Sequence, residues 1–99
     1  MITEHAILAV IPGREAAFEA AFELARPLIS QQSGFVKLSL SRSIETPNEY
    51  LLLVDWDSLE DHTLGFRQSL QYGEWRELLH RFYEPFPTVE HFRTIQPVA

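Results

Sequence analysis

The fold is decided by the stretch Glu49-Tyr-Leu-Leu-Leu-Val-Asp-Trp56, in which nearly every residue is apolar. Such a run predicts a β-strand with packing partners on both faces of its sheet, because successive side chains point to opposite sides. The strand presents two apolar faces, with Tyr50, Leu52, Val54 and Trp56 on one and Leu51 and Leu53 on the other. One face can pack on helices, so the other needs a cover of its own.

Upstream of this stretch, the sequence predicts a strand followed by a helix. Residues 5–11 are β-rich and continuously apolar, which is typical of a strand buried on both faces. Residues 14–32 carry apolar side chains at helical spacing. Pro27 lies inside that pattern and is expected to kink or divide the helix near residue 26. Gly34 is expected to be the C′ residue that ends the helix.

Residues 35–43 predict a second strand, because apolar and polar side chains alternate along them. Only a short loop separates this strand from residues 49–56, so the two are expected to pair as a hairpin. The side chains expected to share one face of the strand are Val36, Leu38 and Leu40.

Downstream, the sequence predicts a helical region in two parts and a last strand. Ser58 is a good N-cap, and Asp61 three residues later completes a relative of the capping box. Gly65 weakens the helix in which it lies, so a break is expected before a second helical stretch over 69–83. Residues 88–95 alternate as a last strand.

The predicted order of elements is therefore β-α-β-β-α-β, in a single domain over residues 1–99. This is the order of the ferredoxin-like α+β fold, in which a four-stranded antiparallel sheet carries helices on one face only. The second face of the sheet would then expose apolar residues to water. The simplest cover is the same face of a second chain, so we expect a two-fold homodimer through the helix-free sheet face.

Composition excludes several classes of protein. The 99 residues carry a net charge of −6 without a basic run, which argues against nucleic-acid binding. The apolar runs are too short to cross a membrane, so no membrane partner is expected. The chain has no cysteine, and a reducing cytoplasm is the expected location. Its four histidines form no HxH or HxxxH pair, so no metal site is expected.

The run from His62 to His91, with Gln71-Tyr-Gly-Glu-Trp75 near its centre, gives the chain a resemblance to a known family. It resembles the antibiotic biosynthesis monooxygenases, a family of dimeric α+β barrel proteins. The resemblance covers essentially the whole chain in element order and is sharpest over residues 54–92, where Asp55-Trp56 closes a strand before a helix. Members of the family include cofactor-free oxygenases of quinols and polycyclic phenols, and also heme-degrading monooxygenases.

The resemblance implies a monooxygenase that oxidises a small, apolar aromatic phenol or quinol without a cofactor. In such members the substrate itself reacts with oxygen once it is deprotonated, so the protein supplies an apolar pocket, a base and donors for an oxyanion. The heme-degrading members carry an Asn early in the first strand and a helical Trp followed ten residues later by a His. This sequence has His5, Phe66 and Arg76 at those places, so heme binding of that type is not expected.

The candidate site lies on the broken helical region 58–83, where polar rings fall beside apolar ones. We expect a pocket between this region and the sheet, with His62 as the general base. The other expected site residues are Tyr72 and Arg67 as oxyanion donors, Phe66 and Trp75 as walls of the substrate-binding pocket, and His91 at its far end.

Each of these residues also has a purely structural interpretation. His62 would then be a buried histidine bonded to a backbone carbonyl, Trp75 a part of the core, and Arg67 the partner of a nearby acidic side chain. His80 is interpreted as a charge at an exposed helix end. The corresponding alternative for the whole protein is a non-catalytic dimeric module that binds or senses an apolar small molecule.

Overall fold

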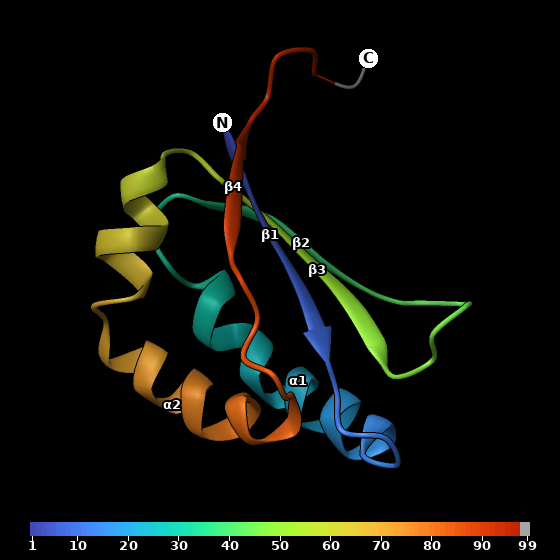
Figure 1. The fold of residues 1–99 in the computed structure, drawn as a ribbon. Helices are drawn as coiled ribbons and strands as arrows, with labels where there is room; N and C mark the ends of the chain where they lie inside the picture. Colours follow the sequence, from blue (N-terminus) through green and yellow to red (C-terminus); the bar gives the residue numbers. More distant parts are fainter. Residues whose placement is uncertain (98–99) are drawn as a thin grey trace.

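Four antiparallel strands form one sheet in the order β2-β3-β1-β4 in the computed structural model, which describes residues 1–97 (Figure 1). The elements follow the predicted order, with two short helical turns added. They are β1 (Ile2–Ala9), α1 (Glu15–Ser30), β2 (Phe35–Arg42), β3 (Glu49–Trp56), the π-helix η1 (Asp61–Phe66), α2 (Leu70–Leu79), the 3-10 helix η2 (His80–Phe82) and β4 (Glu90–Arg93).

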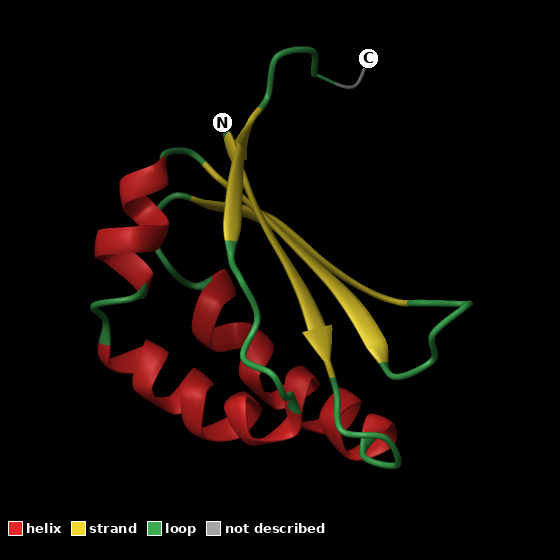
Figure 2. Ribbon diagram, in the orientation of Figure 1, coloured by secondary structure: helices red, strands yellow, loops and turns green. Residues whose placement is uncertain are grey.

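The helices lie on one side of the sheet, and among residues 1–97 its other side carries none (Figure 2). β3 coincides with the predicted strand and separates the two environments. Its four residues on the covered face are buried, whereas Leu51 and Leu53 on the helix-free face are half-buried. The core fills the space between the helices and the sheet, and its largest fully buried side chains include Trp56, Phe18, Phe66, Ile29 and Leu79.

β1 begins at Ile2 rather than at residue 5, and ends at Ala9. The added residues are held on both sides, because they pair with the end of β3 and also with β4. Polar Thr3 and Glu4 interrupt the apolar pattern there, so periodicity alone does not reveal this part of the strand.

β2 departs from strict alternation at Val36. The register with β3 shifts between Phe35 and Lys37, so Val36 is the extra residue of a β-bulge. Val36 is 44% exposed, whereas Leu38 and Leu40 pack against the core. The prediction that Val36 shares their face is wrong, because Phe35 takes the place facing the core.

α1 is continuous through Pro27, so this proline does not divide the helix. Pro27 lies on the exposed face, and Glu23, whose carbonyl loses its amide partner, is exposed as well. Water can therefore replace the missing hydrogen bond.

Gly34 is not the residue that ends α1, because the helix ends at Ser30 with Gln31 as its C-cap. Gly34 lies in the turn before β2 with a φ of +83°. A Cβ at this position would overlap the carboxylate of Asp61. The glycine therefore allows this turn to approach the next helical region closely, and it does not cap the helix.

The predicted capping box at the start of the helical region after β3 is confirmed. The hydroxyl of Ser58 accepts from the N–H of Asp61 at 3.2 Å, and the carboxylate of Asp61 accepts from the N–H of Ser58 at 3.1 Å. The predicted break also occurs, and Ser69 begins α2 by accepting from the N–H of Tyr72 at 3.2 Å. Within residues 1–97, none of the helices has the length and apolar character needed to cross a membrane.

Candidate active site

A cavity lies between the covered face of the sheet and the helical region that follows β3. The volume open to the centres of water molecules in this cavity is about 40 Å³. This is enough for a few waters but too little for an aromatic ring. Its lining includes the exposed side chains of Arg67 and Phe86, so the cavity reaches the surface. Entry of a ring therefore requires side chains at this mouth to move.

η1 brings His62 and Phe66 to the cavity wall. In this π-helical turn the N–H of Arg67 donates to the carbonyl of His62 at 3.0 Å, five residues back along the chain. His62 and Phe66 are only 3% and 2% exposed. After the break, α2 runs in a different direction, so no single helix covers this part of the sheet (Figure 1). π-helical turns occur often at functional sites.

The structure brings five of the six predicted site residues to this cavity, namely His62, Phe66, Arg67, Tyr72 and Trp75. His91 is not part of the wall but contacts His62 from β4. Within residues 1–97, Arg67 forms no ion pair with an acidic side chain. The chemical roles of these residues remain predictions.

A chain of polar contacts runs from Trp56 through Glu4 and His62 to His91. The indole N–H of Trp56 donates to Oε1 of Glu4 at 3.0 Å. Nε2 of His62 lies 3.3 Å from the same oxygen, and Nδ1 of His62 lies 2.8 Å from Nε2 of His91. One placement of hydrogens satisfies all three contacts: the Nε2–H of His62 donates to Glu4, and the Nε2–H of His91 donates to His62. Both imidazoles are then neutral.

Burial shifts the pKa values along this chain. Burial raises the pKa of Glu4, although the bond from Trp56 and the charge of Arg67 lower it in part. Burial, assisted by Arg67 and His91, lowers the pKa of His62 to about 3. Burial and Arg67 also lower the pKa of His91. The carboxyl group is therefore the member of the chain whose pKa moves toward neutrality.

Aromatic rings form the helical wall of the cavity. Phe66 meets Tyr72 and Trp75 edge-on, with ring centroids 5.3 and 5.6 Å apart. Trp75 also packs edge-on against Phe22 of α1 at 5.6 Å and is 6% exposed. Trp75 thus belongs to the core and lines the cavity at the same time.

His80 and Tyr83 also line the cavity, which the sequence pattern does not indicate. The ring of His80 packs among those of Tyr72, Tyr83 and Phe86, at centroid distances of 6.1, 5.6 and 4.9 Å. Burial, followed by the charge of Arg76, lowers the pKa of His80. The interpretation of His80 as an exposed helix-end charge is wrong, because the connector after η2 folds back over it.

Glu4, the one carboxylate among the described residues that line the cavity, is also absent from the predicted site. It lies on the same face of β1 as Ala6, Leu8 and Val10, which are all buried. The alternation of the strand already places this carboxylate on the buried apolar face. A buried carboxylate needs hydrogen-bond partners, so this pattern could have indicated a polar site at Glu4.

Within residues 1–97, no three His, Asp or Glu side chains are arranged to hold a metal ion. Glu4 contacts His62, and His62 contacts His91, so the three side chains form a line of contacts. Their polar atoms therefore do not converge on a common point.

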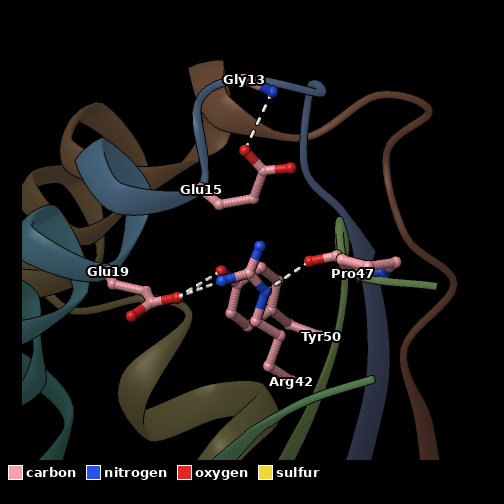
Figure 3. A network of polar contacts seen from close by, with 6 residues as sticks. All are labelled: Gly13, Glu15, Glu19, Arg42, Pro47 and Tyr50. Carbon is pink, nitrogen blue, oxygen red and sulfur yellow. Dashed lines mark hydrogen bonds and ion pairs between the residues drawn. The ribbon is translucent and has the colours of Figure 1, made fainter. Parts of the chain in front are cut away.

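A second polar network lies toward the opposite end of β3, between α1 and the β2–β3 hairpin (Figure 3). The hydroxyl of Tyr50 donates to Oε2 of Glu19 at 2.5 Å, and the guanidinium of Arg42 lies 3.6 Å from the same oxygen. Arg42 also donates to the carbonyl of Pro47. The side chains of Glu19 and Arg42 are about half exposed, at 49% and 45%, so water reaches this network.

The sequence profile of the antibiotic biosynthesis monooxygenases matches residues 1–78. The match extends from β1 through most of α2 and includes both Glu4 and His62. The chain belongs to this family. The resemblance drawn from the run His62 to His91 is thereby confirmed, and the match to this monooxygenase family also takes in the first strand.

Two relatives of this family member are similar along nearly the whole chain. The uncharacterized protein YczJ of Bacillus subtilis (strain 168) is 54% identical over 95 residues, which are 96% of this chain and 100% of YczJ. The crystal structure of a Bordetella bronchiseptica protein assigned to the antibiotic biosynthesis monooxygenases is 42% identical. It has a TM-score of 0.90, with 96% of this chain and 97% of that chain covered.

A more distant structure confirms the fold of this antibiotic biosynthesis monooxygenase family member. SnoaB from Streptomyces nogalater, a cofactor-independent oxygenase, is 20% identical with a TM-score of 0.85, over 98% of this chain and 95% of SnoaB. The ferredoxin-like α+β fold predicted from the sequence is the fold that these structures share.

Proposed function

We propose that this chain is a cofactor-independent monooxygenase that oxidises a small aromatic phenol or quinol. The observation that carries the proposal is the buried Glu4–His62 pair beside an aromatic-lined cavity. A carboxylate–imidazole pair can accept a proton, and aromatic walls stack on flat rings. Membership of the family and the fold shared with SnoaB support the same activity. Such a cysteine-free enzyme would work in the cytoplasm.

The reaction needs a substrate, O₂ and a base that holds one proton at a time. A hydroquinone loses an O–H proton to a base in the Glu4–His62–His91 chain, and a ring carbon then bonds to O₂. The peroxide takes the proton back. The ring C–H proton then goes to the base while the O–O bond breaks and a C=O bond forms. That proton leaves with the departing hydroxide as water.

Electrons and atoms balance in this sequence. The substrate loses four electrons and each atom of O₂ gains two, so the products are a hydroxyquinone and one water. Arg67 and Tyr72 line the same cavity and would donate to the phenolate and the peroxide.

Oxygen consumption with a panel of single-ring hydroquinones and fused-ring phenols, without added cofactor, tests the proposal. We expect consumption of one O₂ per substrate molecule, well above the rate with heat-denatured protein. Single-ring substrates should react faster, because the cavity is small. Binding of these compounds without any oxygen consumption would contradict the enzyme and favour the non-catalytic binding module.

We also propose that two chains pair through the helix-free sheet face. Leu51 and Leu53 are half-buried there, beside the more exposed Ile7 and Phe92. Nδ1 of His5, on the same face, is buried and has no hydrogen-bond partner among residues 1–97. A second copy of this face would cover the apolar side chains and could offer a partner to His5.

Sedimentation of Leu53→Asp tests the dimer, with Leu24→Asp as the matched control. Leu24 is 70% exposed on α1, away from the proposed interface. We expect Leu53→Asp to sediment as a folded monomer at a concentration where the wild type and the control are dimers. A wild type that is monomeric at micromolar concentration, with native circular dichroism, would contradict the pairing.

A further inference from the structure

Glu4 presents one bonded and one unbonded oxygen at the cavity wall. The residue is 6% exposed, and Trp56 and His62 both approach its Oε1, at 3.0 and 3.3 Å. Within residues 1–97, no hydrogen bond reaches Oε2, although the residue lines the cavity. Oε2 is therefore the oxygen that can receive a proton from a molecule in the cavity.

His62 has no nitrogen left for a substrate. Its Nδ1 lies 2.8 Å from His91, and its Nε2 lies 3.3 Å from Glu4. A substrate hydroxyl could reach either nitrogen only by breaking a buried contact, which would leave another polar group without a partner. The same two contacts hold the carboxyl group of Glu4 in one orientation.

We propose that Glu4 takes the phenolic proton and returns it, and that His62 and His91 are positioning residues for its carboxyl group. This inference deepens the proposed function and rests on it. Oε2 accepts the O–H proton of the quinol and delivers it to the peroxide oxygen. As a carboxylate again, it takes the ring C–H proton while the O–O bond breaks, and that proton departs with hydroxide as water.

The direction of each pKa shift supports this division of roles. Burial raises the pKa of Glu4, which makes its carboxylate a stronger base than an exposed one. Burial lowers the pKa of His62 to about 3, which makes the imidazole a weak base and a stable neutral donor. The other charged or titratable side chains around the pair are Arg67, Tyr72, His80, Tyr83 and His91.

The first test compares Glu4→Gln with Glu19→Gln in the oxygen-consumption assay with hydroquinone. Glutamine keeps the acceptor for Trp56 but cannot take the proton. We expect kcat/KM to fall by about 10²–10⁴-fold in Glu4→Gln, with native circular dichroism. The exposed control should stay within a few-fold of the wild type, and Glu4→Asp should recover part of the loss. Full activity of folded Glu4→Gln would overturn the inference.

The pH profile separates the base from the positioning residue. In the wild type, kcat/KM should rise with pH through the raised pKa of Glu4 and then level off, because the base acts as a carboxylate. His62→Phe keeps a ring against Trp56 but removes the donor to Glu4, so the midpoint should move upward. A wild-type profile with no rise above pH 4.5, the ordinary pKa of a glutamate, would overturn the inference.

A wild type that consumes no oxygen would end the proposed function, and NMR with phenol as the probe then decides the role of Glu4. We expect the carboxyl carbon of Glu4 to titrate above 4.5, its ordinary value, and to shift when phenol is added. The nitrogen signals of His62 should show the neutral Nε2–H form from pH 5 to pH 8. A Glu4 signal that titrates normally and ignores phenol overturns the inference, whether or not oxygen is consumed.

Discussion

Glu4 and Glu19 each accept a hydrogen bond from an aromatic side chain, yet their surroundings are opposite. Glu4 is 6% exposed and receives the indole N–H of Trp56. The side chain of Glu19 is 49% exposed and receives the hydroxyl of Tyr50, with Arg42 alongside (Figure 3). The first network is buried beside a cavity with room for only a few waters, so burial shifts the pKa values of its groups. In the second, water and a cation share the charge. The contacts are alike, and burial is what distinguishes the candidate active site from the exposed network.

Deleting the donor of the buried network should have the largest effect. Trp56→Phe leaves Glu4 without its indole partner and leaves a void in the core, so the free energy of unfolding should fall by about 2–4 kcal/mol. Urea denaturation followed by circular dichroism measures the change. A loss below about 1 kcal/mol would show that water replaces the indole N–H, and the contrast between the networks would fail.

A pH titration of stability should show the next largest effect. The native protein keeps His62 neutral down to about pH 3, whereas the unfolded chain binds a proton near 6.5. The unfolded state therefore holds more protons between these values, and the free energy of unfolding should fall as the pH is lowered through this window. The maximal slope from one such group is about 1.4 kcal/mol per pH unit.

The variant His62→Phe isolates this contribution in the same denaturation experiment. Its slope should be smaller than that of the wild type, although His91 still acts in the same direction. Glu4 acts in the opposite direction, because a raised pKa in the native state costs stability as the pH rises. Equal slopes in the two proteins would mean that His62 is not held neutral.

Removing the donor of the exposed network should cost less than removing its buried counterpart. Tyr50→Phe keeps the ring in the core and removes only the hydroxyl bonded to Glu19. We expect a loss of about 0.5–1.5 kcal/mol in the free energy of unfolding, because water can serve the carboxylate in its place. A loss equal to that of Trp56→Phe would erase the distinction between the two sites.

The smallest effect is expected for the cation of the exposed network. Arg42→Gln removes an ion pair with Glu19 whose two side chains are about half exposed. The loss should be at most about 1 kcal/mol, and it should shrink in about 1 M salt, which screens exposed charges. Thermal melts at low and high salt measure it. A larger loss that salt does not reduce would show that this pair is shielded from water.

The strand Glu49–Trp56 could be predicted to the residue because an uninterrupted apolar run, Tyr50–Val54, lies at its centre. The capping box at Ser58 was predictable for a similar reason, since its partners lie three residues apart. The exposed position of Val36 could not be predicted, because a β-bulge depends on the register with the neighbouring strand. Periodicity therefore recovers the local geometry, and the exceptions arise where a distant segment decides it.

The candidate site follows the same rule. The broken helical region could be predicted to border a cavity, because Gly65 is a local signal for the break. Glu4 could not be linked to His62 in this way, since the contact exists only after β1 pairs within the sheet and η1 folds over it. The direction of the His62 pKa shift also depends on the burial of its ring, which is known only from the folded structure.

The two edges of the sheet are poor templates for additional strands. β2 carries the bulge at Val36, next to Lys37 with a side chain that is 75% exposed. β4, on the other edge, has only four residues. Bulges, edge lysines and short strands hinder the edge-to-edge growth that leads to fibrils. In a crowded solution this chain should therefore remain as discrete particles rather than polymerise into filaments.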